Sequence, residues 1–340
     1  MQKVSLFIAA TPWNLLNSLV FAAQSKNENC YLMYVDFPIG QTNPYLDALD
    51  EMQDASPFAE SWCFHGKFKG AWKKWRSRVD ELKQIRQIVA ELKPDQVYVG
   101  SDRRIEFQCA MTEAVRHKPQ VKGVYLDEGV FSYSCRLRSQ TWRDRVLDSW
   151  VKRLMYPCDW KHPATIGGSD WVSEGWLLQP KAACNILQNK LSLHQILPDW
   201  YKHPKVLAFA DALIGDIDTS YSESEFDLLL ILPHPSQLKE EQKGRFSDLL
   251  KPFAEKTVAV KKHPRDDTDP TWTGLNNLVE LPTHVPLEVL LPSIQFKEVF
   301  SAPSTAILSA ICFDSDVKVS LLEKEPLFDA ILAQFLNSKS

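Results

Sequence analysis

The sequence predicts an α/β protein built from two Rossmann-like domains, each a doubly wound parallel sheet. Short apolar runs typical of buried strands alternate with segments of helical periodicity along most of the chain. The alternation starts afresh after the small, polar stretch 220–225, Ser-Tyr-Ser-Glu-Ser-Glu, which is the best linker candidate. We therefore expect an N-terminal domain over 1–224 and a C-terminal domain over 225–340.

The N-terminal half alternates from its first residues. The run 4–10 is apolar and β-branched, and a Thr-Pro-Trp-Asn turn follows it. The segment 79–92 repeats apolar residues every three or four positions, as an amphipathic helix does, and Pro94 ends it. Strands are expected at 4–10, 30–35, 61–64, 96–99 and 124–126, and helices at 15–23, 79–92 and 106–116.

The C-terminal half repeats the alternation. Its first run, 228–232, is entirely apolar, as in a strand buried on both faces of a parallel sheet. Strands are expected at 228–232, 258–260, 278–281, 298–301 and 317–320, with helices at 240–253 and from Ser304 onward.

Composition excludes several classes of protein. The 340 residues carry a net charge of about −4, which gives no global argument for nucleic-acid binding. The seven cysteines are scattered without a Cys-x-x-Cys pair, which fits neither a zinc site nor a disulfide framework and indicates a reducing compartment. No window approaches 18 uninterrupted apolar residues, and the apolar start reads as a strand rather than a signal peptide. We expect a cytoplasmic protein.

Two basic, aromatic-rich segments stand out, at 67–78 and 136–161. Lysines and arginines mixed with tryptophans are typical of helices that lie on anionic membrane surfaces. Such segments can also receive an anionic or carbohydrate acceptor. The alternative is a solvated basic helix face whose aromatic side chains pack inward. One expectation from these segments is therefore peripheral contact with the anionic inner face of the cytoplasmic membrane.

Adjacent acids end the strand at 124–126. Asp127 and Glu128 follow it directly, and Gly129 comes next. In open α/β sheets, ligands bind outside the carboxyl ends of the strands, so this stretch is a candidate site for a proton acceptor. The alternative is a turn, since Asp and Gly often end strands for conformational reasons.

A second candidate follows the strand at 258–260. Cationic residues gather there with His263, and Pro264 restricts the backbone after the histidine. Several cationic donors at a strand end suit a phosphate, and a histidine can donate a hydrogen bond or a proton to a departing phosphate oxygen. His-Pro is also a common dipeptide without function. The cationic residues are Lys261, Lys262 and Arg265.

A third candidate follows the strand at 298–301. Ser304 and Thr305 begin an apolar helix with Pro303 just before them. Hydroxyls and free N–H groups at a helix N-terminus can bind an anion, although a plain helix cap has the same appearance.

In their order along the chain, the three motifs resemble those of the bacterial sialyltransferases. That superfamily includes the lipooligosaccharide sialyltransferases and the capsule polysialyltransferases, which share an acidic-acidic-Gly, a His-Pro and a Ser-Ser/Thr motif. The corresponding residues are Asp127-Glu128-Gly129, His263-Pro264 and Ser304-Thr305. One departure is that the hydroxyl pair is serine followed by threonine. The segments 10–16, 232–236 and 282–288 also look like loops of that group.

The resemblance implies a GT-B glycosyltransferase whose two domains face each other across a cleft. It implies a CMP-activated sialic acid or related nonulosonic acid as donor, an oligosaccharide or glycolipid acceptor at the bacterial surface, inversion, and neither metal nor cofactor. Asp127, or Glu128 as the second choice, would be the catalytic base, and His263, Ser304 and Thr305 would neutralise the leaving phosphate. Gly129, Lys262, Pro264 and Arg265 would line the donor site, with the alternative that Lys262 and Arg265 face solvent. Glu288 would accept from the ribose or base, or simply be a helix N-terminal charge.

Other functions remain open from the sequence. A CMP-Kdo transferase would keep the fold and change the donor sugar. A CDP-alditol phosphotransferase also sets a histidine and Ser/Thr hydroxyls around a phosphate. A protein of another class, a non-catalytic glycan- or nucleotide-binding protein on the same scaffold, would not need the two carboxylates.

Overall fold

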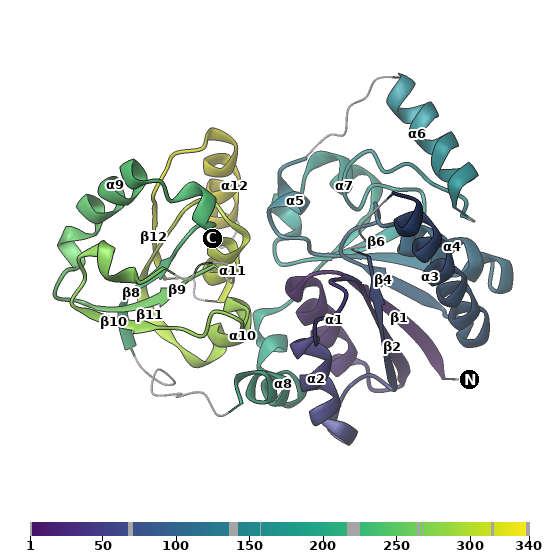
Figure 1. Ribbon diagram of the computed structural model, residues 1–340, viewed down its shortest axis with the longest axis horizontal. Helices are drawn as coiled ribbons and strands as arrows, with labels where there is room; N and C mark the ends of the chain where they lie inside the picture. The colour runs from purple at the N-terminus through teal and green to yellow at the C-terminus, as the bar shows by residue number, and fades with distance from the viewer. Residues whose placement is uncertain are drawn as a thin grey trace. The chain divides into compact units, whose positions relative to one another are not determined.

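The computed structural model describes residues 2–66, 71–135, 142–156, 158–215, 225–263, 266, 268–313 and 316–337. The chain divides into two compact units, Met1–Ala212 (unit 1) and Leu213–Ser340 (unit 2). Each unit contains its own parallel sheet flanked by helices (Figure 1). Residues 216–224, which include most of the expected linker, lie outside the described residues.

Unit 1 is built on a seven-stranded sheet of order β3-β2-β1-β4-β5-β6-β7, and every described pair is parallel. Its first five strands confirm the predicted ones. The last two were not predicted, because β6 carries polar residues and a glycine and β7 is a short, partly exposed edge strand. The strands are β1 (Lys3–Ala9), β2 (Glu28–Phe37), β3 (Glu60–His65), β4 (Gln96–Val99), β5 (Lys122–Leu126), β6 (Val172–Leu177) and β7 (Ser192–Gln195).

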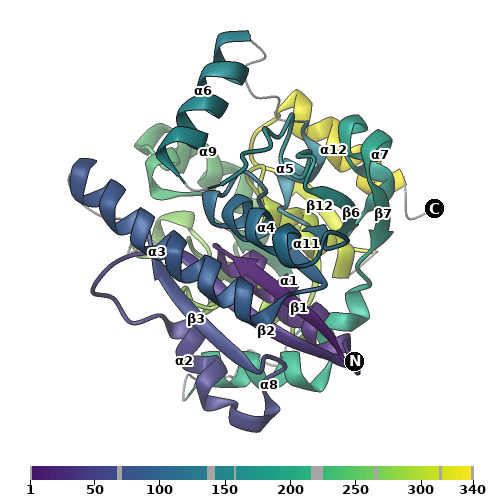
Figure 2. The same cartoon turned by 90° about the vertical axis from the view of Figure 1, so that its right-hand side faces the viewer.

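Helices cover both faces of this sheet. α1 and α2 lie on one face and α3 and α4 on the other (Figures 1 and 2), as right-handed crossovers require when the strand order reverses beside β1. The helices are α1 (Pro12–Gln24), α2 (Pro44–Glu51), α3 (Ala71–Leu92), α4 (Ile105–His117), α5 (Val130–Tyr133), α6 (Trp142–Met155), α7 (Asn185–Lys190) and α8 (Pro204–Ile214).

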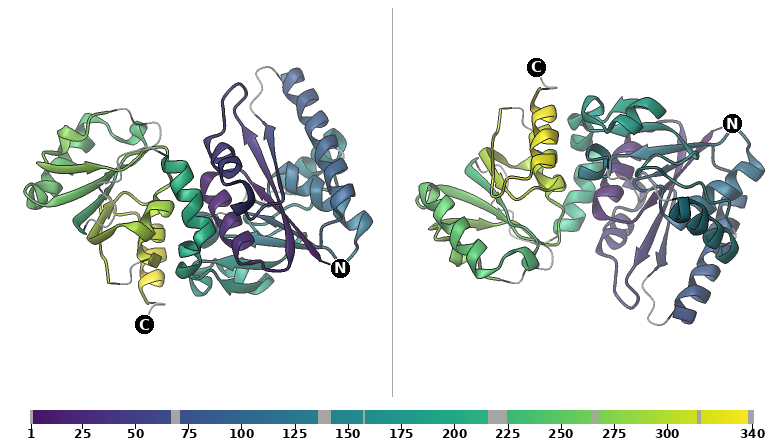
Figure 3. Two further views of the ribbon diagram at one scale, coloured as in Figure 1. Left: turned by 90° about the horizontal axis from the view of Figure 1, so that it is seen from below. Right: turned by 90° about the horizontal axis from the view of Figure 1, so that it is seen from above.

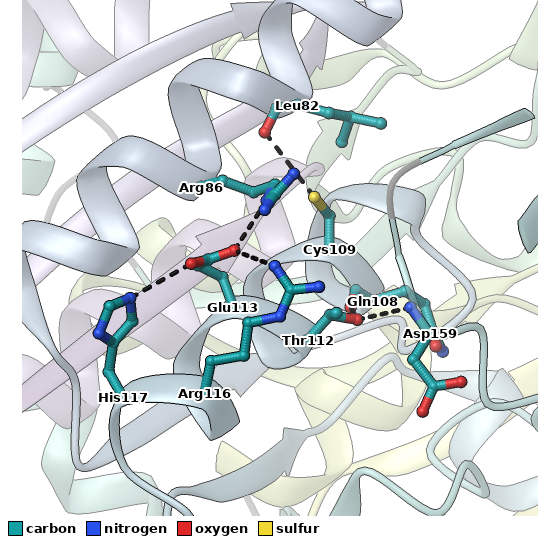
Figure 4. Close-up of polar contacts among 9 residues, drawn as sticks. All are labelled: Leu82, Arg86, Gln108, Cys109, Thr112, Glu113, Arg116, His117 and Asp159. Carbon is teal, nitrogen blue, oxygen red and sulfur yellow. Dashed lines mark hydrogen bonds and ion pairs between the residues drawn. The ribbon is translucent and has the colours of Figure 1, made fainter.

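A polar network joins α3 to α4 (Figure 4). Glu113 of α4 accepts from Arg86 of α3 at 2.7 Å, and it also contacts Arg116 at 3.1 Å and His117 at 3.2 Å on its own helix. Burial raises the pKa of Glu113, but the hydrogen bond and charge of Arg86, with help from His117 and Arg116, bring it below its ordinary value. The network keeps α4 in place, and α4 begins where β4 ends.

Glu113→Gln is expected to destabilise unit 1 by about 2 kcal/mol, because a charge-assisted hydrogen bond to Arg86 is lost in a largely buried setting. Because the folded pKa is depressed, the stabilisation is present above the pKa of the unfolded glutamate and disappears as pH falls through the folded value. Urea unfolding of wild type and variant at neutral and acidic pH measures this. Glu91→Gln, an exposed position on α3, is the control and should change little. If the difference in free energy of unfolding between wild type and Glu113→Gln stays the same at acidic pH, this account is wrong.

Unit 2 carries a five-stranded parallel sheet of order β10-β9-β8-β11-β12, and all five strands confirm predicted ones. Its core packs α9 side chains, Phe246 and Leu250, against alternate residues of β8 and β9. The elements are β8 (Glu225–Ile231), α9 (Glu240–Leu250), β9 (Thr257–Lys261), β10 (Asn277–Glu280), α10 (Leu287–Leu290), β11 (Gln295–Ser301), α11 (Thr305–Phe313), β12 (Lys318–Leu321) and α12 (Pro326–Asn337).

The parallel strands of both sheets can be followed in Figure 3. Several helices differ from expectation. α3 begins at Ala71 rather than at 79, because its basic, tryptophan-rich start continues the helix. The helices that were not predicted are α2, α5, α6, α7, α8, α10 and α12. Among the described residues, no helix is long and apolar enough to cross a membrane.

Candidate active site

In unit 1 the strand order reverses between β1 and β4, which is the topological switch point of the sheet. The carboxyl ends of neighbouring strands lie in register there, with Ile8 opposite Val99 and Val99 opposite Tyr125. The loops after β1, β4 and β5 therefore emerge side by side. In open α/β sheets this is where ligands bind.

Asp127, the first residue after β5, is completely buried. Its carboxylate accepts hydrogen bonds from the backbone N–H groups of Gly129 at 2.6 Å and Leu178 at 2.9 Å, and from the hydroxyl of Tyr133. Burial raises its pKa to about 6, although these hydrogen bonds oppose the shift. Through its hydrogen bond with Leu178, Asp127 joins the end of β5 to the segment after β6. Because the carboxylate is completely buried, the structure does not favour Asp127 over Glu128 as the base.

Glu128, the next residue, is partly exposed and points to the switch point. Its Oε2 accepts a hydrogen bond from the side-chain amide of Asn14, which lies at the start of α1. The two side chains meet over Gly100, the residue after β4. A Cβ atom at that position would lie 2.1 Å from Asn14 Nδ2 and 2.5 Å from Glu128 Oε2. Because Gly100 has no side chain, the space beside it can be occupied by Asn14 from the loop after β1 and by Glu128 from the loop after β5.

Burial raises the pKa of Glu128, and the negative charges of Asp127 and Asp102 add to the shift. The hydrogen bond from Asn14 and the charge of Arg104 oppose it. A carboxylate with a raised pKa and partial exposure has the proton affinity and the access that a general base needs.

Gly129 has a backbone role. Its φ of +69° is a conformation that other residues rarely adopt, and it turns the chain from β5 into α5. Its buried N–H donates to Asp127. The structure thus explains the glycine of this motif without a ligand, and its predicted contact with the donor stays a prediction.

Gly100→Ala is expected to lower kcat/KM by about a hundredfold while the fold is kept, because the new methyl group displaces the flexible ends of Glu128 and Asn14 rather than the backbone. The measurement is transfer activity together with thermal unfolding. Gly244→Ala in α9 is the matched control, since a Cβ there meets no described heavy atom within 4 Å. Full activity in Gly100→Ala would show that the position of Glu128 is unimportant.

Unit 2 has its own switch point, between β8 and β11. Lys261, Ile231 and Ser301 lie in register across β9, β8 and β11. His263 follows β9 and His234 follows β8. Their rings meet edge to face, with centroids 4.6 Å apart. His263 therefore lies beyond the carboxyl end of β9, as predicted, and next to the switch point of this sheet.

The hydroxyl motif follows the neighbouring strand. Ser304 precedes the N-terminus of α11, and Thr305 is the first helical residue, which confirms the predicted helix start. The Ser304 hydroxyl lies 3.3 Å from that of Ser301, which itself donates to the carbonyl of Ala302 at 2.8 Å. Ser304 and Thr305 are both partly exposed at the amino end of a nine-residue helix, a setting that favours an anion.

The lysines before the histidine serve the framework. Lys261 is buried and donates to the carbonyls of Pro282 and Thr283 at 2.6 and 3.0 Å, which anchors the loop after β10. Burial lowers its pKa to about 8, against the opposing charge of Glu288. Lys262 forms an ion pair with Glu280 at 2.6 Å.

Glu288 of α10 is buried, and Ser309 of α11 donates to it at 3.3 Å. Burial raises its pKa, and the Ser309 bond and the charge of Lys261 oppose the shift. Its carboxylate thus contacts α11, and the predicted contact with a nucleotide remains a prediction. Pro264 and Arg265 lie outside the described residues. Among those described, no group of three or more His, Cys, Asp and Glu side chains is placed to hold a metal ion.

Two residues were missed as site candidates. Asn14 was noted only as part of a turn, and its contact with Glu128 depends on a residue more than a hundred positions away. His234 lies three residues after β8, the first strand of the second α/β unit, and its position just beyond a strand end is a usable signal in the sequence.

The chain is similar to known glycosyltransferases. The family model for α-2,8-polysialyltransferases matches residues 240–323. No curated protein matches the chain in sequence. The α/β-galactoside α-2,3-sialyltransferase of the luminous marine bacterium Photobacterium phosphoreum superposes with a TM-score of 0.62 at 13% identity, over 99% of this chain and 96% of that one.

Two further structures share the fold. The glycotransferase of kitacinnamycin has a TM-score of 0.56 at 10% identity, over 98% of this chain and 84% of that one. Arabidopsis thaliana UGT89C1, complexed with UDP-L-rhamnose, has a TM-score of 0.53 at 10% identity, over 99% and 90%. Structural similarity at a sequence identity this low establishes only a shared fold, which is GT-B. The segment that matches the α-2,8-polysialyltransferase model contains His263, Glu288, Ser304 and Thr305. The similarity in sequence to that family therefore falls on the part of unit 2 that carries the predicted donor-site residues.

Proposed function

We propose that the protein transfers sialic acid, or a related nonulosonic acid, from its CMP-activated form to a bacterial surface glycan or glycolipid, with inversion and without a metal. The observation that carries the proposal is the position of the three motifs at the two switch points. Unit 1 presents a carboxylate there, and unit 2 presents a histidine and two hydroxyls. The match of residues 240–323 to the polysialyltransferase model supports the choice of donor.

Glu128 is the proposed base. It takes the proton of the acceptor hydroxyl as that oxygen bonds to the anomeric carbon of the donor sugar and the bond from that carbon to the CMP phosphate breaks. A single displacement of this kind inverts the configuration. Asn14 orients the carboxylate through its hydrogen bond to Oε2.

Unit 2 is proposed to stabilise the leaving CMP. His263 donates a hydrogen bond or a proton to the departing phosphate oxygen, and the hydroxyls of Ser304 and Thr305 donate to the developing charge at the start of α11. In this proposal Lys262, which also pairs with Glu280, and Arg265 add positive charge that favours the leaving phosphate. These donors would act on the phosphate in place of a metal ion.

The rate of transfer is expected to fall as pH is lowered through the pKa of Glu128, because the protonated carboxyl cannot accept a proton. Burial raises that pKa, so the fall should begin at higher pH than for an exposed glutamate. Asn14→Ala removes a hydrogen bond that lowers the pKa and should move the acid limb of kcat/KM to still higher pH. The pH profile of kcat/KM for both proteins tests this. An acid limb at the same pH in Asn14→Ala would remove Glu128 from the assignment.

The donor is tested by calorimetric titration with CMP, using CDP and UDP as controls and a chelator in the buffer. Binding of CMP that His263→Ala weakens supports the proposal, and incubation with CMP-sialic acid and CMP-Kdo then separates the two sugars. The configuration of the newly formed glycosidic bond, read by NMR, tests inversion. Binding of UDP in preference to CMP, or a strict metal requirement, would overturn the donor assignment and leave the GT-B fold.

A further inference from the structure

Two cysteines that are far apart in the sequence meet between α5 and α7 of unit 1, which lie side by side (Figure 1). Cys135 lies two residues after the end of α5, and Cys184 is the residue directly before α7. The backbone N–H of Cys184 donates to the carbonyl of Ser132 at 3.1 Å. Carbonyls in the last turn of a helix need a partner outside that helix, and this bond supplies one. It fixes the start of α7 against the end of α5.

The side chains of the two cysteines are also in contact, because the thiol of Cys184 hydrogen-bonds with that of Cys135. Neither cysteine is in a disulfide bond. Cys184 is 4% exposed, whereas Cys135 is partly exposed. The φ of Cys135 is +46°, which is unfavourable for a residue with a side chain. The contact between the thiols is therefore held by the surrounding structure and not by local backbone preference.

The other cysteines lack this combination of access and contact. Cys30, Cys109 and Cys158 are buried, so a molecule in solution does not reach their thiols. Cys63 is partly exposed, and its sulfur accepts from the side-chain amide of Asn43 at 3.9 Å. The pair formed by Cys135 and Cys184 thus joins one thiol that a small molecule can reach to a buried thiol beside it.

We propose that Cys135 and Cys184 are a reversible disulfide site that is oxidised by a small disulfide such as glutathione disulfide. Cys135, the accessible residue, attacks one sulfur of glutathione disulfide. Its proton passes to the glutathione that leaves, and a mixed disulfide remains on Cys135. Cys184 then attacks the sulfur of Cys135 and releases the second glutathione, which takes the proton of Cys184. Two protein thiols are oxidised, and one glutathione disulfide is reduced to two molecules of glutathione.

The surroundings of Cys184 agree with its place as the second thiol to react. Burial raises the pKa of Cys184 to about 11, and the hydrogen bond with Cys135 adds to the shift. Cys184 is therefore a thiol at neutral pH and is a poor first nucleophile. Once glutathione is attached to Cys135, the contact between the two side chains places Cys184 next to the sulfur that it attacks.

The disulfide site is linked to the acidic motif through α5. The Ser132 hydroxyl accepts from the backbone N–H of Glu128 at 2.9 Å, and the hydroxyl of Tyr133 donates to Asp127. A disulfide bond is about 2 Å long, which is shorter than a hydrogen-bonded contact between two thiols. Its formation pulls the end of α5 toward α7 and displaces the groups that hold Glu128. We therefore expect oxidation to slow transfer. This effect rests on the proposed function, whereas the disulfide itself does not.

The test uses the full chain, reduced, freed of reductant and incubated with glutathione disulfide under native conditions. Peptide mapping is expected to find Cys135 linked to Cys184, and dithiothreitol should reverse the link. Cys184→Ser should stop at a mixed disulfide with glutathione on Cys135. Cys63→Ser, which removes a partly exposed cysteine of β3, is the matched control and should still form the link. If mapping of the wild type finds no such link, or finds it only in urea, the disulfide site is wrong. This result needs no variant.

Transfer from CMP-sialic acid is measured on the same samples. Oxidation of the wild type is expected to lower kcat about tenfold, and dithiothreitol should restore it. Cys135→Ser forms neither the mixed disulfide nor the link, so its kcat should not respond to glutathione disulfide. If the linked protein transfers as fast as the reduced protein, oxidation does not reach the site and the expected regulation is wrong. If the reduced wild type transfers no sialic acid, the proposed function fails instead, and peptide mapping still decides the disulfide site.

Discussion

Glu128→Gln is expected to reduce transfer by a factor of about 10³ while CMP binding remains unchanged. The substitution keeps the shape of the side chain and removes its ability to accept a proton, and general base catalysis contributes about 10²–10⁴ in rate. Binding should survive, because the proposed CMP site is on unit 2. Single-turnover transfer and CMP calorimetry on the same preparation measure the two effects.

The matched control is Asp127→Asn. Asp127 accepts from two backbone N–H groups and from Tyr133, so an amide NH₂ at this buried position would face donors. We expect a loss of about 2–3 kcal/mol of stability, seen as a lower unfolding midpoint, with transfer retained by the protein that stays folded. Loss of transfer in folded Asp127→Asn together with full activity in Glu128→Gln would reverse the assignment. If neither variant changes transfer, neither carboxylate is the base.

His263→Ala is expected to lower kcat by about 10²–10³ and to weaken CMP binding, because a hydrogen-bond donor to the leaving phosphate is lost. Ser304→Ala combined with Thr305→Val should have a similar effect on kcat, since both changes remove donors to the same charge. The measurement compares kcat with CMP-sialic acid to kcat with a second donor whose leaving group is less basic than CMP. The better leaving group should restore part of the rate in His263→Ala, because it needs less protonation.

His194→Ala is the control for a histidine substitution, since its side chain is 42% exposed on an edge strand of unit 1. It should leave kcat unchanged. A normal kcat in both His263→Ala and the double hydroxyl variant would exclude the proposed phosphate site at the switch point of unit 2.

Two α/β units and most of their strands were predictable from the sequence. Strand β4 was predicted at 96–99 and observed at Gln96–Val99, and the five strands of unit 2 were all expected. The reason is local, since buried parallel strands are short apolar runs with clear ends. Strand β6 failed this criterion, because its polar residues and Gly175 interrupt the run and its pairing with β5 supplies the stability instead.

The sequence by itself determined that an acidic pair, a histidine and two hydroxyls follow strand ends, and therefore which chemistry to look for. Only the tertiary structure decided between the acids. Adjacent residues after a strand point in different directions, and the partners that bury Asp127 lie up to 51 residues away, whereas those of Glu128 are Asn14 and the space over Gly100. The same holds for the corner formed by α3 and α6. Their basic and aromatic composition is visible in the sequence, but which side chains line a pocket and which are exposed depends on how the two helices pack.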